Sequence, residues 1–223
     1  EGILRPPRPS CRWASFPPLG RGWGFCDRGP GRGLLGLLLR AREPSLTVTG
    51  LELPPAACAL ADRTAAANGL TDRLITLPCD LRDRRQLPSA GRFDLAVSNP
   101  PYFPAGGGKT AVGSRGIHRA ELACTMEQLC AAAAYLLRSG GQFCLVYRTE
   151  RLAELMETLR RHRLEPKVLR FVQKSAASAP SLLRVACRRD GGTGRAVQPP
   201  LLLQNDDGTE TPELRRIYFK EKG

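Results

Sequence analysis

Residues 23–53, WGFCDRGPGRGLLGLLLRAREPSLTVTGLEL, decide the fold of this chain. Trp23–Asp27 is a short apolar run that predicts a buried strand, and a glycine-rich turn separates it from the apolar helix predicted over Leu34–Leu39. Leu46–Leu53 is β-branched and mostly apolar, which predicts a second buried strand. A strand, a tight turn, a helix and another strand in succession form the repeating unit of a parallel α/β sheet.

The alternation continues along most of the chain. Further helices are predicted over Ala56–Ala67, residues 119–137 and Arg151–Arg163, and further strands over Leu74–Leu77, Phe93–Ser98, Gln142–Tyr147, Val168–Val172 and Ser181–Cys187. The last two strands have no helix clearly between them, so we expect them to form an antiparallel edge. The pattern predicts an α/β fold with a mostly parallel, doubly wound sheet.

The two ends of the chain differ from this middle part. Residues 1–22 are rich in Pro, Arg and Gly, and we interpret them as an irregular, truncated or aberrant segment, since the first residue is Glu1. Residues 23–195 make up the predicted catalytic domain. Residues 196–223 are expected to form a C-terminal tail packed on that domain, with a short helix over Pro212–Tyr218 and Thr211 as its N-cap.

The 223 residues include 34 Lys plus Arg and 21 Asp plus Glu, so the net charge is 34 − 21 = +13. Residues 43–137 are neutral, with 9 − 9 = 0, whereas residues 138–195 carry 13 − 5 = +8. This distribution predicts either a basic rim that binds nucleic acid or a set of solvated arginines. The apolar stretches are too short to span a bilayer, and eight Cys without a CxxC pair favour a reduced, cytoplasmic location.

The turn after the first strand reads Asp27-Arg28-Gly29-Pro30-Gly31-Arg32-Gly33. Gly29, Gly31 and Gly33 allow the backbone to approach a ligand at the carboxyl edge of the sheet, where such folds bind cofactors. Glu52, followed by Leu53, ends the second strand where an acid can accept hydrogen bonds from ribose hydroxyls. Asp80 and Leu81 follow the third strand, where they could hold an adenine. The alternatives are an exposed acid for Glu52 and a helix N-cap for Asp80.

Asn99-Pro100-Pro101-Tyr102 directly follows the fourth strand. The two prolines stiffen the backbone and remove two N–H donors. The Asn99 side-chain carbonyl and the Pro100 carbonyl can then accept both hydrogens of a planar amino group. Tyr102 offers a face on which a flat base can stack. A plain turn is the alternative, because Asn-Pro commonly begins turns.

In their order and spacing, these motifs resemble those of class I S-adenosylmethionine-dependent methyltransferases that act on amino groups through an NPPY motif. NPPYFP, His118-Arg119-Ala120-Glu121, RLEPKVLRFV and a PPL…DG…Y tail resemble the bacterial tRNA(Val) (adenine(37)-N6)-methyltransferases, over about Asp27 to Phe219. The resemblance implies a Rossmann-like, seven-stranded sheet with an antiparallel edge. It also implies S-adenosylmethionine as cofactor, tRNA as substrate, and N6-methylation of adenosine 37 in the anticodon loop.

The resemblance also implies roles for individual residues. Asp27, Gly29, Gly31 and Gly33 would line the methionine end of the cofactor, Glu52 and Leu53 its ribose, and Asp80 and Leu81 its adenine. Asn99, Pro100, Pro101 and Tyr102 would hold the target base, with Asn99 also beside the cofactor. Three residues depart from the family pattern in the glycine turn, namely Arg28, Pro30 and Arg32.

The remaining features give predictions about partners. Candidate phosphate contacts are Arg115, Arg119, Arg148, Arg151, Arg170 and Lys174, each of which could equally be a solvated cation. Gly106–Thr110 resembles the end of a P-loop but lacks its first glycine, so we interpret it as a loop over the active site. We expect no metal, no membrane and a monomer. Alternative functions are methylation of a protein glutamine, an rRNA guanine or a DNA adenine, and an RNA-binding module without catalysis.

Overall fold

The structure is a computed structural model, and it describes residues 19–28, 34–100 and 124–217. In these ranges the strands and helices alternate over most of the chain. The strands are β1 (Gly24–Arg28), β2 (Thr47–Glu52), β3 (Leu74–Pro78), β4 (Phe93–Ser98), β5 (Leu137–Arg148), β6 (Leu164–Gln173), β7 (Leu182–Arg189) and β8 (Ala196–Leu202). The helices are α1 (Leu34–Arg42), α2 (Pro55–Ala67), α4 (Met126–Leu136), α5 (Leu152–Arg161) and α6 (Pro212–Ile217).

All of these strands belong to one sheet, in the order β3-β2-β1-β4-β5-β7-β6-β8. The pairs from β3 to β5 are parallel, and β7 is antiparallel to both β5 and β6. The predicted fold class, with its antiparallel edge, is confirmed. The prediction of seven strands is corrected to eight, because β8 lies in the segment expected to be a tail and pairs in parallel with β6.

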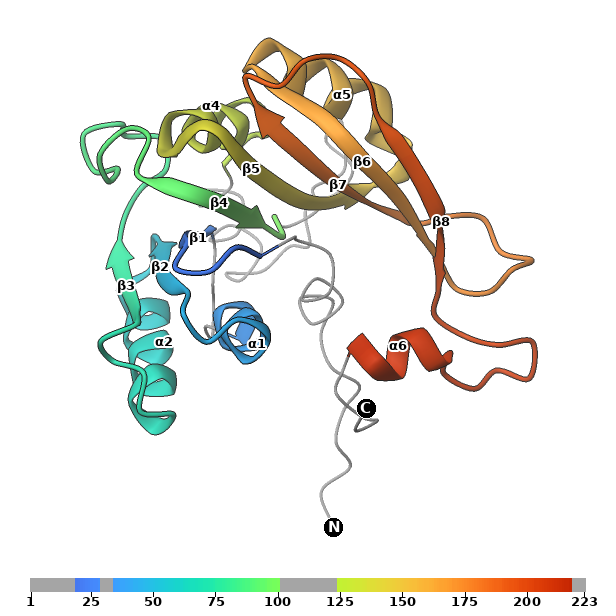
Figure 1. Cartoon of the computed structure of the whole chain (residues 1–223), viewed down its shortest axis with the longest axis horizontal. Helices are drawn as coiled ribbons and strands as arrows, with labels where there is room; N and C mark the ends of the chain where they lie inside the picture. Colours follow the sequence, from blue (N-terminus) through green and yellow to red (C-terminus); the bar gives the residue numbers. More distant parts are fainter. Residues whose placement is uncertain (1–18, 29–33, 101–123, 218–223) are drawn as a thin grey trace, which may run out of the picture.

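Helices cover both faces of the sheet (Figure 1). α1 and α2 lie on one face, and α4 and α5 lie on the other. α1 packs closely against β2, since a Cβ added to Gly36 would lie 2.9 Å from Val48 Cγ1. Glycine at this position therefore lets the helix approach the sheet, as expected of the apolar run that follows the glycine turn.

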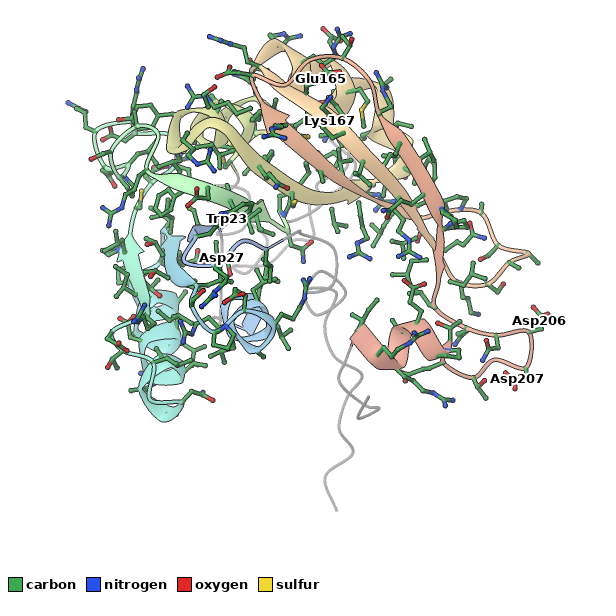
Figure 2. The ribbon with its side chains drawn as sticks, in the orientation of Figure 1. Trp23, Asp27, Glu165, Lys167, Asp206 and Asp207 are labelled. Carbon is green, nitrogen blue, oxygen red and sulfur yellow. The ribbon has the colours of Figure 1, made fainter. Side chains whose placement is uncertain are left out.

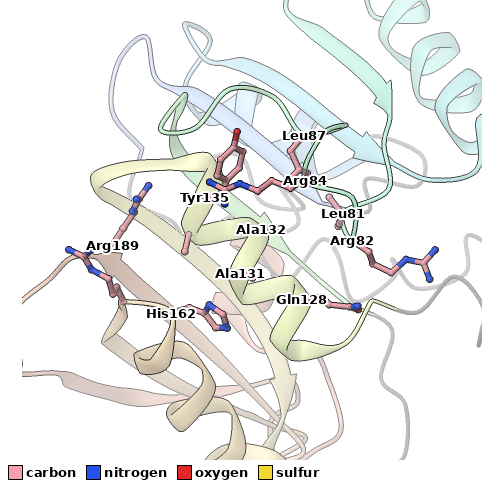
Figure 3. A pocket seen from close by; sticks show the side chains of 12 residues that line it. Leu81, Arg82, Arg84, Leu87, Gln128, Ala131, Ala132, Tyr135, His162 and Arg189 are labelled. Carbon is pink, nitrogen blue, oxygen red and sulfur yellow. The ribbon is translucent and has the colours of Figure 1, made fainter.

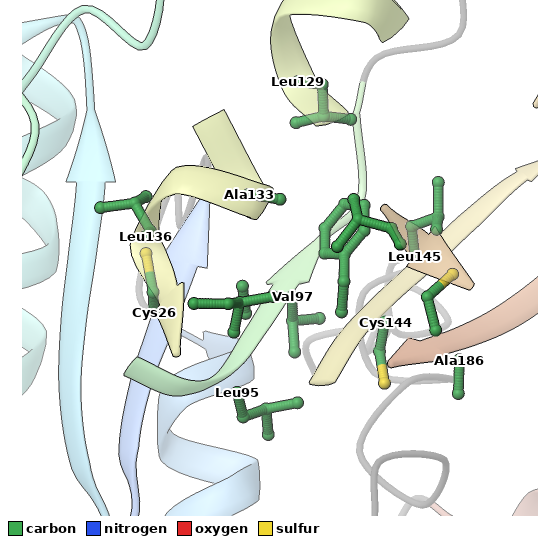
Figure 4. Packing of buried hydrophobic residues seen from close by; sticks show 14 of the residues in the cluster. Cys26, Leu95, Val97, Leu129, Ala133, Leu136, Cys144, Leu145 and Ala186 are labelled. Carbon is green, nitrogen blue, oxygen red and sulfur yellow. The ribbon is translucent and has the colours of Figure 1, made fainter. Parts of the chain in front are cut away.

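The largest core cluster lies between the central strands and their covering helices (Figure 4). Leu95 and Val97 of β4 are fully buried, as are Ala133 and Leu136 of α4. Fully burying a Leu or Val side chain contributes about 1.5–3 kcal/mol to folding. This packing fixes the position of β4, whose carboxyl end carries Asn99.

α4 differs from its predicted helix, residues 119–137, of which 119–123 lie outside the described residues. Its first helical residue is Met126, because the Thr125 side chain accepts a hydrogen bond from the Gln128 amide and Gln128 caps the Thr125 amide in return. Its last residue is Leu136, and β5 begins at the next residue, Leu137. Gly140 has φ +75°, a conformation that favours glycine in the first part of this strand.

α6 docks the end of the chain onto the sheet. Its predicted N-cap is confirmed, because Thr211 Oγ1 accepts a hydrogen bond from the Leu214 amide. Leu214 and Ile217 are buried. Glu213 binds the Arg170 guanidinium of β6 with two hydrogen bonds, of 2.6 and 2.8 Å. The C-terminal segment thus contributes both a strand and a docked helix to the fold.

Candidate active site

The carboxyl ends of β2, β1 and β4 bring together polar residues that are far apart in the sequence. β1 lies between the other two strands, with Asp27 paired to Gly50 on one side and to Val97 on the other. Glu52 ends β2, and Asn99 follows β4. The strand order reverses between β1 and β4, and open α/β sheets bind ligands at the edge beside such a switch point.

Asp27 is the most deeply buried acid of this edge (Figure 2), with 3% of its surface exposed. Burial, together with the nearby charge of Glu52, raises the pKa of Asp27 from 3.8 to about 7. Among the described residues, Asp27 Oδ2 has no hydrogen-bond partner. A buried acceptor without a donor is costly, so this carboxylate is suited to a ligand that carries a cation or N–H groups.

Glu52 lies at the carboxyl end of β2 with its side chain partly exposed. Its carboxylate accepts a hydrogen bond from the Leu53 amide at 3.2 Å, and its backbone carbonyl accepts one from the Cys79 amide at 2.9 Å. The second bond extends the β2–β3 pairing beyond Pro78 and carries Asp80 to the same edge. Glu52 and Leu53 therefore lie where the sequence predicts a ribose contact, which itself stays a prediction.

Asp80 begins a turn, so its interpretation as a helix N-cap is wrong: residues 79–92 form turns and contain no helix. Its carboxylate accepts hydrogen bonds from Arg82 Nε at 2.9 Å and Nη2 at 2.7 Å, and this pairing lowers the pKa of Asp80. The Asp80 amide donates to Gln86 Oε1. The turn therefore holds Asp80 and Leu81 in place beside Glu52.

Asn99 and Pro100 extend from the carboxyl end of β4, directly after the buried Ser98. Ser98 pairs with Arg28 of β1, so Asn99 follows at the edge that carries Asp27. Both Asn99 and Pro100 are partly exposed, as a group that meets a substrate must be. Pro101, Tyr102, Gly29, Gly31 and Gly33 lie outside the described residues, as do Arg115, Arg119, His118 and Gly106–Thr110.

The remaining candidate phosphate contacts lie near the ends of β5 and β6. Arg148 is paired with Glu150 at 2.7 Å, and Arg151 binds both Glu154 and the Tyr147 hydroxyl. Lys174 is exposed. Arg170 binds Glu213, which gives it a structural role in docking α6. None of these residues lies in the groove described below, and their RNA contacts stay predictions.

The sequence reasoning missed one group of basic residues. Arg82, Arg84, Arg163 and Arg189 line a groove of about 340 Å³ beside α4 (Figure 3). Arg82 and Arg84 lie within Asp80–Arg85, which contains three Arg and two Asp, and this concentration of charge was the available signal. The other two come from the ends of α5 and β7, and only the fold brings them close.

The edge can hold a cofactor of the expected kind. S-adenosylmethionine has an ammonium group, ribose hydroxyls and an adenine, and Asp27, Glu52 and the turn at Asp80 offer a matching series of acceptors along adjacent strands. The buried Asp27 Oδ2, without a partner among the described residues, is the observation that supports this fit. In the described part of the chain, no three His, Cys, Asp or Glu side chains are grouped to hold a metal.

Within the described ranges, no helix is both long and apolar enough to cross a membrane. This finding concerns α1, α2, α4, α5 and α6, of which α2 is the longest at 13 residues.

Comparison with known proteins finds similarity to methyltransferases. The sequence profile of the family described as the methyltransferase small domain matches residues 21–171. A protein of Porphyromonas gingivalis strain W83 named tRNA1(Val) (adenine(37)-N6)-methyltransferase is 33% identical over 199 residues, which cover 86% of this chain and 76% of that protein. The protein of the same name from strain ATCC 33277 is 35% identical over 150 residues, covering 64% of this chain and 57% of the relative.

Two further matches widen the comparison. A release factor glutamine methyltransferase of Chlorobaculum tepidum is 30% identical over 141 residues, covering 60% of this chain and 48% of the relative. The crystal structure of a predicted O-methyltransferase from Agrobacterium tumefaciens superposes with a TM-score of 0.77 at 18% identity, covering 93% of this chain and 94% of the other. At that identity, the superposition shows a shared fold.

Proposed function

This chain belongs to the methyltransferase small domain family, and we propose that it methylates the N6 amino group of an adenine in tRNA, namely adenosine 37 of the anticodon loop. It is an S-adenosylmethionine-dependent methyltransferase, as the cofactor prediction states. The adenine substrate is supported by the name of the Porphyromonas gingivalis relatives and by the NPPY motif. We expect the enzyme to act in the cytoplasm.

The observation that carries the proposal is the position of Asn99 and Pro100 at the edge that also holds Asp27 and Glu52. Asp27, Glu52 and the turn at Asp80 would hold S-adenosylmethionine, which would supply an electrophilic methyl group for the amine nitrogen. Asn99 Oδ1 and the Pro100 carbonyl would accept the two amine hydrogens and orient the nitrogen lone pair toward the methyl group. The amine then loses one proton to water.

The charge of the chain favours RNA over a protein substrate. Residues 138–195 carry a net +8, and each phosphate contact made by a cation adds affinity that salt removes. The glutamine methyltransferase relative supports a protein glutamine as a second candidate substrate, because a glutamine amide also presents a planar NH2 group. An rRNA guanine and a DNA adenine present similar groups.

The decisive experiment offers methyl-labelled S-adenosylmethionine to the full chain together with bacterial tRNA, rRNA, DNA or release factors. We expect label in tRNA, on the N6 of adenine. Asn99→Ala should lower the rate about 100-fold or more, because it removes an acceptor used during the reaction. Asn68→Ala, at the exposed end of α2, is the matched control and should retain the wild-type rate.

The outcomes separate the alternatives. Label in release factors but not in tRNA would replace the proposal with glutamine methylation. Failure of the wild-type chain to bind S-adenosylmethionine at equilibrium would instead support an RNA-binding module without catalysis. Equal rates for Asn99→Ala and the wild type would show that Asn99 does not hold the amine.

A further inference from the structure

The groove beside α4 is a second candidate binding site, and it lies on the face of the sheet covered by α4 and α5 (Figure 3). Its floor is apolar and is formed by Ala131 and Ala132 of α4 together with Leu87. Leu81 lines the groove and directly follows Asp80, so part of the groove adjoins the candidate cofactor edge. We define this feature as the α4 groove.

The local sequence explains why the groove is open. The connection from β3 to β4, residues 79–92, forms turns rather than a helix that would cover α4. The outer side of α4 carries small side chains, and Ala131 among them is exposed. α4 has 11 residues, so it extends for about 16 Å. An extended ligand can therefore lie along the groove and lead away from the active edge.

The walls of the groove are basic. Among the described residues, four Arg side chains line it, and no Asp or Glu side chain does so. Asp80 is paired with Arg82, and Asp190 lies 2.8 Å from Arg163 and 3.7 Å from Arg189. With these two acids subtracted, the four Arg leave 4 − 2 = 2 positive charges. His162 also lines the groove, and its Nε2 atom lies 2.7 Å from Glu127 Oε1.

Arg84 is the wall residue best placed to meet a ligand. Its guanidinium carbon lies 4.3 Å from the centre of the Tyr135 ring, on α4. This contact holds the guanidinium of an exposed side chain against an aromatic face. A planar, preorganised guanidinium suits the two-point recognition of a phosphate group.

We propose that the α4 groove binds the sugar–phosphate backbone of the RNA whose adenine enters the active site. The inference rests on the proposed function, since it takes RNA as the substrate. Arg84, Arg163 and Arg189 would contact phosphate oxygens, and the alanine floor with Tyr135 would accommodate a ribose or base. Charge complementarity, the apolar floor and the position of Leu81 directly after Asp80 favour RNA over an acidic protein.

The test measures binding of a fluorescently labelled anticodon stem-loop RNA by anisotropy, at several KCl concentrations. The groove variant combines Arg84→Gln with Arg163→Asn; Arg163 has φ +59°, a conformation that asparagine tolerates. The control variant combines Arg63→Gln with Arg195→Asn, which removes the same charge from exposed positions on α2 and before β8. We expect the groove variant to lose about 10-fold in affinity and the control to change less than about two-fold.

A second pair of variants tests the floor without removing any Arg. Ala131→Glu and Ala131→Gln add side chains of similar size at an exposed helix position, and they differ only in charge. We expect Glu to weaken RNA binding at least about five-fold more than Gln, because the Glu carboxylate repels the phosphates. Melting temperatures and S-adenosylmethionine affinity should be the same for both variants, since neither contacts the cofactor edge.

The results distinguish failure of this inference from failure of the proposed function. If wild type methylates tRNA but the groove and control variants lose affinity equally, the groove proposal is wrong and the function stands. If wild type neither binds nor methylates tRNA, the RNA function is wrong and the groove proposal fails with it.

Discussion

At the scale of the residue, Asp27 carries the strongest physical signal of the candidate site. The carboxyl is 3% exposed, and burial with the nearby Glu52 raises its pKa to about 7. Its Oδ2 atom has no partner among the described residues. A buried carboxyl of this kind lowers the folding stability of the unliganded chain. Residues that bind ligands often carry such a cost.

Asp27→Asn should change how stability depends on pH. In wild type the folded chain holds the Asp27 proton up to a pKa of about 7, whereas the unfolded chain loses it near 3.8. The folded state therefore binds more protons between these values, and its stability falls as pH rises from about 4 to about 7. Asn cannot ionise, so this fall should be absent in the variant.

Melting temperatures of both proteins at pH 5, 6, 7 and 8, without cofactor, measure the difference. The advantage of the Asn variant over wild type should grow up to about pH 7 and then stay constant. Parallel pH profiles for the two proteins would contradict a raised Asp27 pKa. The variant should also bind S-adenosylmethionine more weakly, because the role proposed for the Asp27 carboxylate is to bind the ammonium group of the cofactor.

At the scale of the element, α4 links the core, the active edge and the groove. Its inner side packs on β4 through Ala133 and Leu136, and its outer side carries Ala131 and Tyr135 of the groove. Its first residue is fixed by the capping box of Thr125 and Gln128. Because the cap decides where the helix begins, it also fixes the first turn of α4, in which Gln128 lines the groove.

Thr125→Ala should destabilise the folded chain by about 1 kcal/mol, because it removes an N-cap acceptor at an exposed site. Thr125→Ser keeps the hydroxyl and should stay within about 0.3 kcal/mol of wild type. Urea denaturation followed by circular dichroism measures both variants. Equal loss from Ala and Ser would show that the methyl group of Thr125, and not its hydroxyl, stabilises α4.

At the scale of the whole molecule, charge and fold are arranged together. The neutral residues 43–137 contribute β2, β3 and β4, and with them most of the described part of the active edge. The strongly basic residues 138–195 contribute β5 to β7 and two Arg of the groove. The chain thus places the candidate site beside basic surfaces, and the α4 groove draws Arg82 and Arg84 from the neutral segment.

The affinity of the whole chain for tRNA should fall steeply with salt. The three phosphate contacts proposed for Arg84, Arg163 and Arg189 predict that affinity drops by about 20- to 40-fold between about 50 and 200 mM KCl, because each contact releases a bound counterion. Equilibrium binding of wild type to tRNA over this range measures the slope. A response within two-fold would show that the basic surfaces do not carry the binding.

The sequence by itself determined the alternation of strands and helices, the residues at the strand ends and the family. These are local properties: apolar periodicity, turn residues and short motifs are readable along the chain. It missed β8, since Ala196–Leu202 contains two consecutive Pro and is mostly exposed, so its strand character depends on pairing with β6. It placed the start of α4 too early, because an Ala-rich pattern does not itself mark where a helix begins. The capping residue Thr125 marks that point.

Only the tertiary structure decided which side chains meet. Asp27, Glu52 and Asn99 could be predicted to share an edge, because parallel strands align their carboxyl ends. The burial of Asp27 could not, since it depends on how closely the neighbouring strands pack. The α4 groove joins Arg84, from a turn, with Arg163 and Arg189, from elements some 80 to 100 residues later. Such long-range proximity follows from strand order and helix packing, which no local pattern encodes.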